Sequence, residues 1–166
     1  ISEIGEIKDF CPELELEAFV HGAMCISYSG RCLLSNYLAG RDSNRGECVQ
    51  ACRWKYYLRA EGKDGEISAE EDDRGTYIFN SKDLNMSAHL AELAAAGVDS
   101  FKIEGRMKSA YYVATVVNTY RRLLDGTMTE EDAARELDTA AHRDYTQAYA
   151  FGANANTVHY ADSQAA

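Results

Sequence analysis

The sequence contains no apolar run that approaches the roughly 18 residues of a membrane-spanning helix. Its first residues, ISEIGEIKDF, are acidic and amphipathic, and they lack the basic and then apolar segments of a secretory signal peptide. Hydrophobic residues make up 46% of the chain and charged residues 27%, which is typical of a globular protein. We therefore expect a cytoplasmic protein with no membrane partner, in which thiols stay reduced.

Positive charge is also scarce, since 17 Lys and Arg residues stand against 27 Asp and Glu residues and give a net charge of -10. This balance argues against nucleic-acid binding by the whole surface. The region from Arg31 to Arg59 differs, because it holds six basic residues and only two acidic ones. This basic island is compatible with contact to RNA phosphates and equally with ordinary solvated arginines. Its basic residues are Arg31, Arg41, Arg45, Arg53, Lys55 and Arg59.

Motifs that would identify a hydrolase are absent. The sequence has neither a G-x-S-x-G nucleophile elbow nor an H-E-x-x-H zinc-binding helix. The C-x-x-C pair that is usual in zinc knuckles and thioredoxin-type sites is absent as well. The sequence therefore gives little support to a peptidase.

Cysteines are present, and four of the five lie in the segment HGAMCISYSGRCLLSNYLAGRDSNRGECVQACRWK, residues 21–55. Glycines divide this segment into turns that can wrap an irregular ligand. In a reducing compartment, clustered cysteines are more often metal-binding or catalytic than disulfide-bonded. An iron-sulfur cluster and a tetrahedral zinc ion both suit four such thiolates, and unliganded thiols are the third alternative. The fifth cysteine, Cys11, is expected to be a core thiol.

Hydrophobic periodicity predicts an alternation of strands and helices. The segment ELELEAFV is typical of a strand with apolar residues on one face and glutamates on the other. Ser81, Ser109 and Thr129 are the expected N-caps of three helices. From residue 76 to residue 125, strand, helix, strand and helix alternate in the order of a parallel sheet. The fold class is therefore predicted to be α/β. The predicted strands are 13–20, 54–60, 76–80 and 98–105, and the predicted helices are 81–97, 109–126 and 129–142.

Several separated motifs resemble the collagenase-like peptidase family of unassigned mechanism. The segment ELEAFVHGAMCISYSGRCLLS is similar to the family signature of Glu, Phe, Gly, a small residue and Cys, followed by Gly-x-Cys and Ser. Further similar blocks are NRGECVQACRW, FNSKDL, GVDSFKIEGRMKSAYYVATVVNTYR and AHRDYTQAY. The last block and the tryptophan after the second cysteine pair resemble the branch that acts in hydroxylating the wobble uridine of tRNA.

This resemblance implies a (β/α)8-type barrel and a [4Fe-4S] cluster, which by residue matching would be held by Cys25, Cys32, Cys48 and Cys52. It also implies a role in tRNA uridine 5-hydroxylation with a small anionic co-substrate derived from prephenate. The family name keeps a collagenase-like peptidase as an alternative function. A non-catalytic module stabilised by zinc is the third function considered.

The matched blocks belong to the later half of family members. Residues 1–152 are therefore expected to form the C-terminal portion of a barrel with a cysteine-rich excursion, followed by a polar tail at 153–166. A partial barrel exposes strand edges, which a homo-oligomer would cover. The row of Glu13, Glu15 and Glu17 fits a polar barrel interior that is exposed.

Candidate site residues follow from strand ends and from the basic island. His21 ends the first predicted strand, and Glu104 and Arg106 end the strand at 98–105, so all three are expected at the rim where substrates bind. Each also has a purely structural interpretation, as a strand-end histidine or an ion pair. For RNA phosphates the candidates are Arg31, Arg53 and Lys55.

Overall fold

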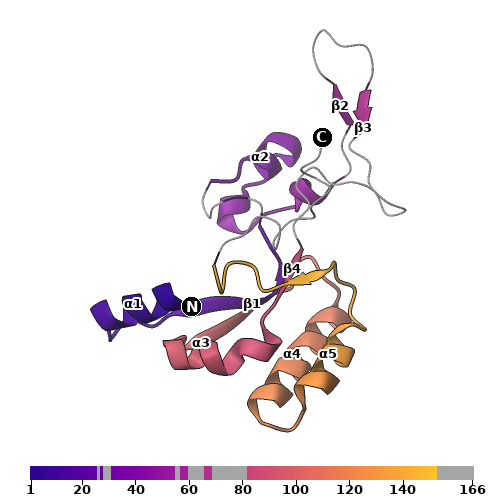
Figure 1. Cartoon of the computed structure of the whole chain (residues 1–166). Coiled ribbons are helices and arrows are strands. Elements are labelled where there is room, and N and C mark those ends of the chain that lie inside the picture. Colours follow the sequence, from indigo (N-terminus) through magenta and orange to yellow (C-terminus); the bar gives the residue numbers. More distant parts are fainter. Residues whose placement is uncertain (26, 28–30, 55–56, 60–65, 69–81, 153–166) are drawn as a thin grey trace. The chain divides into compact units, whose positions relative to one another are not determined.

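The computed structural model describes residues 1–25, 27, 31–54, 57–59, 66–68 and 82–152 (Figure 1). The chain divides into two compact units. The first, which we name the sheet unit, comprises Ile1–Met24 and Lys82–Val158. The second, the cysteine unit, comprises Cys25–Ser81 and His159–Ala166.

The sheet unit is built on four strands in the order β5-β1-β4-β6. Strands β1 and β5 are parallel, and so are β4 and β6, whereas β1 and β4 are antiparallel. The α/β class is thus confirmed, but the sheet is open and mixed, and the predicted partial barrel is not confirmed. The strands are β1 (Glu17–Ala23), β4 (Asp83–Asn85), β5 (Ser100–Glu104) and β6 (Tyr145–Thr146).

Figure 1 shows three helices of this unit, α3, α4 and α5, on one side of the strands. Two of them begin where the sequence predicts, because the Ser109 hydroxyl accepts a hydrogen bond from the Tyr112 N–H and the Thr129 hydroxyl accepts one from the Asp132 N–H. The helices of the unit are α1 (Ser2–Phe10), α3 (Leu90–Ala96), α4 (Ala110–Leu124) and α5 (Glu130–Leu137). The short 3-10 helix η3 (Ser87–His89) precedes α3.

The core lies between the helices and one face of the sheet. Val20 of β1 is fully buried there, and Ala18 packs against the same core. Burial of such side chains is the main driving force of folding, at about 25 cal/mol per Å² of apolar surface. The buried core cluster consists of Val20, Leu84, Met86, Leu90, Leu93, Val98, Tyr112, Val116, Tyr120, Leu137 and Ala140.

The opposite face of β1 and β5 is exposed and polar. Phe19 is 52% exposed, and the Lys102 ammonium lies 4.9 Å from the centre of its ring. The same ammonium lies 3.2 Å from the Glu17 carboxylate. Glu13 and Glu15 are exposed as expected. The expected exposed row of glutamates is therefore confirmed, although only Glu17 of the three lies within the strand.

One predicted helix begins too early. Residues 83–85, which were expected in the helix 81–97, form β4 and pair with β1 and β6. Leu84 is buried between Gly22 and Thr146, its register partners. The helix itself is confirmed from Leu90 onward and ends where predicted, with Gly97 in a left-handed conformation. Long-range strand pairing thus overrides the local helical pattern at its start.

Other predicted elements are confirmed in part. Strand β5 lies within the predicted strand 98–105, and β2 (Tyr57–Arg59) lies within the predicted strand 54–60. Strand β2 pairs in antiparallel fashion with β3 (Glu66–Ser68). The predicted strand 76–80, the expected N-cap Ser81 and the predicted tail 153–166 lie outside the described residues.

The cysteine unit contains short helices joined by tight turns. Helix α2 (Leu34–Ala39) ends at Gly40, which adopts a left-handed conformation with φ 64°. Helix α2 contacts two 3-10 helices, η1 (Ser43–Arg45) and η2 (Ala51–Arg53). No helix among the described residues has the length and apolar character to cross a lipid bilayer.

Candidate functional site

The four clustered cysteines all lie in the cysteine unit. Cys25 is exposed, and Cys32, Cys48 and Cys52 are half-buried. Cys11, in contrast, lies in the sheet unit and is exposed, so its expected role as a core thiol is wrong. All five cysteines are within the described part of the chain, and no disulfide bond joins any two of them. The quartet is therefore accessible in part and chemically available for a ligand.

Hydrogen-bond donors point at two of these sulfurs. The Cys48 Sγ accepts from the Gln50 N–H at 3.3 Å and from the Ser35 hydroxyl at 3.8 Å. The Cys25 Sγ accepts from the Ser27 N–H at 3.5 Å. Donors of this kind stabilise a thiolate and are one of the means by which proteins tune the sulfurs around a cluster.

A buried serine fixes the surroundings of Cys48. The Ser35 side chain on α2 is only 1% exposed, and its hydroxyl also accepts a hydrogen bond from the Val49 N–H at 3.2 Å. Gln50, just beyond, has a left-handed backbone with φ 55°, which is uncommon for a residue other than glycine. The Cys48–Cys52 turn is therefore held by specific contacts and not by burial of apolar side chains alone.

The loop at Cys32 is held in a similar way. Its carbonyl oxygen accepts hydrogen bonds from the Ser43 hydroxyl at 3.0 Å and from the Asn44 side-chain amide at 3.1 Å. Both donors belong to η1, whose start is capped by the Asp42 carboxylate. The expected glycine-rich turns between the cysteines are thus present at Gly40 and Gly46, which both have positive φ.

Two observations test whether these residues fit a metal or cluster. Among the described residues, no three or more His, Cys, Asp or Glu side chains are grouped closely enough to hold a metal ion. Sites of this kind rarely exist before the metal binds, because binding and local folding are coupled. The donor set itself fits, since four thiols outside any disulfide lie in one unit and donors point at the Cys25 and Cys48 sulfurs.

His21 lies in the sheet unit and is buried, with 1% of its surface exposed. Its Nδ1 lies 3.1 Å from the Tyr120 hydroxyl, which donates its own proton to the Val20 carbonyl at 2.8 Å. The hydroxyl proton is thereby used, so Nδ1 carries a proton and donates to Tyr120. Nε2 then has an unprotonated lone pair, and it has no hydrogen-bond partner among the described residues.

Burial lowers the pKa of His21 to about 4, against an ordinary value of 6.5. The neighbouring Asp83 opposes this shift, and His142 and Lys108 add to it. Burial also raises the pKa of Tyr120. At neutral pH His21 is consequently neutral, and its Nε2 is suited to accept a hydrogen bond and not to donate a proton.

We expect this buried histidine to make folding stability pH-dependent. The unfolded chain binds a proton at His21 below pH 6.5, whereas the folded chain resists protonation down to about pH 4. The contribution of His21 to folding stability is therefore fully present above pH 6.5, and it is lost as the pH decreases towards 4. Between about pH 7 and about pH 5 the loss from this group is about 2 kcal/mol. Urea unfolding at several pH values gives the free energy of unfolding of the parent chain and of His21→Gln. The parent chain should lose more of this free energy between about pH 7 and about pH 5 than the variant does.

Asn118→Ala is the control for that measurement, because Asn118 is exposed and carries no titratable group. The control should keep the pH dependence of the unfolding free energy of the parent chain. An NMR titration in which the His21 ring protonates near its ordinary pKa would contradict the account.

Glu104 and Arg106 lie at the edge of the sheet where β1 and β5 end. Glu104 pairs in register with Gly22, next to His21, so the predicted rim residues share this edge. The Glu104 carboxylate accepts a hydrogen bond from the Arg106 N–H at 3.1 Å and so fixes the turn after β5. The Arg106 side chain is exposed. The catalytic roles proposed for His21, Glu104 and Arg106 stay predictions.

A buried carboxylate at the same edge was not singled out as a site from the sequence. Asp83 is fully buried at the start of β4, with the Lys108 ammonium 3.5 Å from its carboxylate and the Arg143 N–H 3.3 Å away. The His142 and Tyr145 rings stack nearby at 4.0 Å. Asp83 lies in the block FNSKDL, and its neighbours His142 and Arg143 lie in the block AHRDYTQAY, and both blocks carried the family resemblance.

The expected RNA-contacting residues are placed in part. Arg31 is exposed, and no ion pair joins it to another described residue. Arg53 ends η2, and its side chain lies outside what the structure describes, as does the whole of Lys55.

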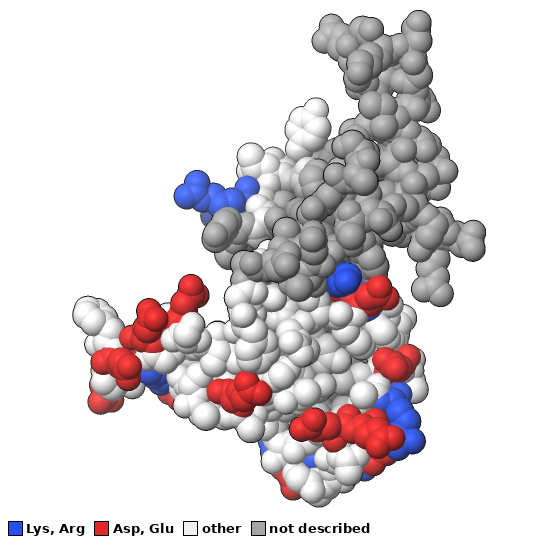
Figure 2. All heavy atoms as spheres, viewed as in Figure 1, with Lys and Arg blue, Asp and Glu red and all other residues white. Residues whose placement is uncertain are grey.

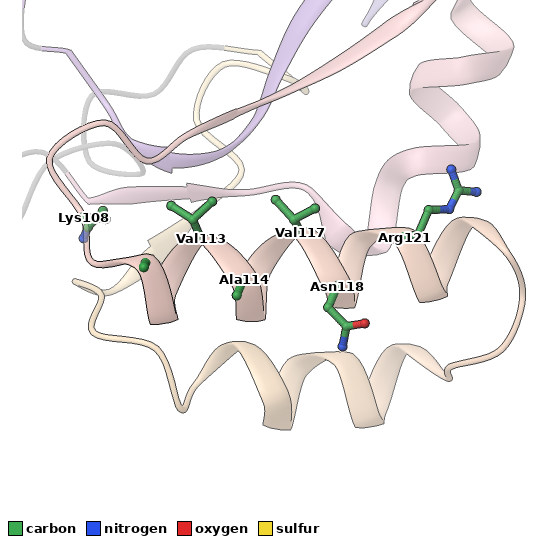
Figure 3. A pocket seen from close by; sticks show the side chains of 7 residues that line it. Lys108, Val113, Ala114, Val117, Asn118 and Arg121 are labelled. Atoms are coloured by element: carbon green, nitrogen blue, oxygen red, sulfur yellow. The ribbon is translucent and has the colours of Figure 1, made fainter.

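An open hollow of about 610 Å³ lies along α4 (Figure 3). Val113 and Val117, 37% and 47% exposed, form its apolar floor. The Arg121 guanidinium beside it is paired with Asp125, the C-cap residue of this helix. The hollow therefore offers mainly apolar surface, and the Lys108 ammonium at its edge is paired with Asp83. Its lining is Lys108, Ala110, Val113, Ala114, Val117, Asn118 and Arg121.

The fold and the site define an α/β protein whose sequence carries a cysteine-rich unit after β1 and before β4. Residues 1–160 match the family model described as peptidase family U32, and the chain belongs to that family. No solved structure matches the chain.

Three relatives illustrate what the chain is similar to. It is 38% identical to tRNA hydroxylation protein P of Haemophilus influenzae, over 90% of this chain and 43% of the relative. It is 42% identical to tRNA hydroxylation protein P1 of Bacillus subtilis, over 89% of this chain and 36% of the relative. It is 36% identical to a collagenase of Porphyromonas gingivalis, over 84% of this chain and 34% of the relative. The chain therefore spans less than half the length of these relatives.

Proposed function

We propose that the chain is part of a protein that hydroxylates RNA, and that it acts in tRNA uridine 5-hydroxylation. The observation that carries this proposal is the identity of 38% and 42% to two tRNA hydroxylation proteins over about nine-tenths of the chain. In this proposal residues 1–152 are the C-terminal portion of a (β/α)8-type barrel in a cytoplasmic protein. A homo-oligomer would cover strand edges that such a portion exposes.

The proposed cofactor is a [4Fe-4S] cluster, with zinc as the alternative. Its ligands would be Cys25, Cys32, Cys48 and Cys52, and the N–H and O–H donors at the Cys25 and Cys48 sulfurs support this choice. A bound cluster would supply electron transfer, or the binding and activation of an oxygen donor. Within the chain, Ser35 and Gln50 would position the Cys48 sulfur and favour its thiolate form.

The proposed co-substrate is a small anion derived from prephenate, held at the sheet edge that carries Glu104 and Arg106. The exposed Arg106 guanidinium would pair with its carboxylate, which a planar guanidinium does well. The buried, neutral His21 would support this edge as a hydrogen-bond acceptor. Arg31, Arg53 and Lys55 would contact phosphates of the tRNA.

A chimera tests the function. We expect this chain, exchanged for the matching segment of the Haemophilus influenzae protein, to sustain 5-hydroxyuridine in the tRNA of cells that lack their own protein. Mass spectrometry of tRNA nucleosides measures the product. The same chimera with Cys32→Ala should lose it, because one of four ligands is missing. If the Cys32→Ala chimera forms as much 5-hydroxyuridine as the unaltered chimera, hydroxylation does not need the four cysteines. If neither chimera forms 5-hydroxyuridine, the proposed function is rejected.

The peptidase named by the third relative is the second candidate. In the described part of the chain no histidine is hydrogen-bonded to a serine or a cysteine, as an activated nucleophile would require. We expect the purified chain to leave gelatin intact. Gelatin cleavage that persists after all four clustered cysteines are replaced would favour the peptidase.

A further inference from the structure

An aromatic side chain of the cysteine unit is exposed without a structural role. Tyr37 on α2 is 86% exposed, so it contributes almost nothing to packing. Leu33, which precedes the helix, is 70% exposed, and Trp54, which follows η2, is 42% exposed. Because α2 contacts η2, these side chains belong to one small body. A concentration of exposed aromatic and apolar side chains on such a body indicates a binding surface.

Two arginines follow Tyr37 in the same small body. Arg41 follows the end of α2, and its N–H donates to the Ser35 carbonyl at 3.1 Å, so its backbone is fixed to the helix. Arg45 ends η1, which contacts α2, and its side chain is 84% exposed. Its Nε lies 3.8 Å from the Asp42 carboxylate, at the limit of an ion pair. Arg41 is exposed, and Arg45, although paired with Asp42, keeps most of its side chain exposed, so both side chains can reach an anionic partner.

The charge of this unit contrasts with that of the whole chain. Figure 2 shows blue basic side chains on the described part of the cysteine unit, while red acidic side chains are concentrated over the sheet unit. Residues 31–54 hold four arginines against Asp42 and Glu47, in a chain whose net charge is -10. An aromatic side chain beside positive charge is the combination that binds unpaired nucleotides, since every base has a stacking face and every nucleotide a phosphate.

The surface is also held firmly to the cysteine segment. Helix α2 is anchored by the buried Ser35, whose hydroxyl contacts both the Val49 N–H and the Cys48 sulfur. An RNA base bound at Tyr37 would therefore be fixed relative to Cys48 through a single buried residue. A duplex would gain little here, because its bases are already stacked and cannot be shared with an aromatic ring.

We propose that the surface formed by Tyr37, Arg41 and Arg45 binds the unpaired nucleotides of an RNA loop. Tyr37 stacks on one base, and the two arginines contact the adjacent phosphates. This inference rests on the proposed function, because it specifies how the RNA partner of the same chain is held. It adds a base-stacking residue, Tyr37, to the phosphate-contacting residues expected from the sequence.

The test compares two RNA probes by fluorescence anisotropy with the whole chain. One probe is a hairpin whose loop contains unpaired uridines, and the other is a fully paired duplex with the same number of phosphates. We expect Tyr37→Ala to weaken hairpin binding about tenfold and to leave duplex binding unchanged. Tyr37→Phe should bind like the parent chain, and Tyr37→Leu should bind like the alanine variant, because leucine has no stacking face.

Tyr111→Ala is the matched control, because Tyr111 is a 62% exposed tyrosine on a helix of the sheet unit. It should leave hairpin binding unchanged. Equal binding by the parent chain and Tyr37→Ala would overturn the proposal, as would full binding by Tyr37→Leu, which would indicate an apolar protein contact. A parent chain that does not bind the hairpin would overturn it as well.

The RNA-binding surface at Tyr37 and the proposed hydroxylation function can be rejected separately. Hairpin binding that depends on Tyr37, without 5-hydroxyuridine formation by the chimera, would reject the function and keep the RNA surface. Hydroxylation by the chimera together with hairpin binding that is insensitive to Tyr37 would reject the surface alone.

Discussion

Cys48→Ala should remove most of the iron and sulfide from the chain when it is purified without oxygen. The parent chain is expected to contain about four irons and about four sulfides and to absorb visible light, as a cubane cluster does. The Cys48 sulfur accepts hydrogen bonds from the Gln50 N–H and the Ser35 hydroxyl, so it is the best supported of the four ligands. Without it the remaining thiols cannot complete a four-thiolate site, and the cluster is lost during purification.

Cys11→Ala is the control for this experiment. Cys11 is a fifth cysteine in the same chain, exposed and outside the cysteine unit. Its replacement should leave iron, sulfide and the absorbance spectrum unchanged. Equal iron content in Cys48→Ala and the parent chain would remove Cys48 from the site, and zinc without sulfide in the parent chain would favour the zinc module.

Gly22→Ala should destabilise the sheet unit by about 3 kcal/mol. Gly22 has φ +112°, a backbone conformation that favours glycine. A Cβ at this position would lie 2.2 Å from the Glu104 carbonyl oxygen, which is backbone and cannot rotate away. Strands β1 and β5 would have to separate at the pair Gly22 and Glu104. The free energy of unfolding from urea titration measures the loss.

Gly126→Ala separates the steric effect from the backbone effect. Gly126 also has a positive φ, +67°, but nothing lies within 4 Å of an added Cβ. Its replacement should therefore cost only the backbone strain, about 1 kcal/mol. Equal losses in the two variants would show that the contact with Glu104 has no energetic weight.

The starts of α4 and α5 were predictable from the sequence because capping is local. Ser109 and Thr129 each accept a hydrogen bond from an N–H three residues later, as their sequence context indicated. The buried face of α4 does not follow hydropathy alone. Val113 and Val117 are exposed, whereas Thr115 and Thr119 are buried. The Thr119 hydroxyl bonds to the Thr115 carbonyl, which satisfies a polar group that hydropathy alone places outside.

The short strands were not predictable, because their stability comes from distant partners. Strand β4 has three residues and β6 has two, too few for a periodic signal. Strand β4 pairs with β1 and with β6, and each of these partners lies about sixty residues away from it in the sequence. The mixed sheet could therefore not be derived from the strand-helix alternation.

In the candidate site, too, features set by local sequence were predicted and features set by distant residues were not. The four cysteines were identified from spacing and resemblance, because clustering is visible in the sequence itself. The burial of His21 was not foreseen, because its ring neighbours Tyr112, Tyr120 and Tyr145 come from far along the chain. The role of Ser35 was not predicted either. The sequence identified Ser35 only as part of the family motif, whereas in the structure its hydroxyl contacts the Val49 N–H and the Cys48 sulfur.

Native mass spectrometry of the anaerobically purified parent chain tests the central claim most directly. If Cys25, Cys32, Cys48 and Cys52 bind one iron-sulfur cluster, the folded chain should exceed its polypeptide mass by about four irons and four sulfides. Four alkylated thiols should appear only after the cluster is removed. A folded chain with the bare polypeptide mass and all four thiols open to alkylation would contradict the claim.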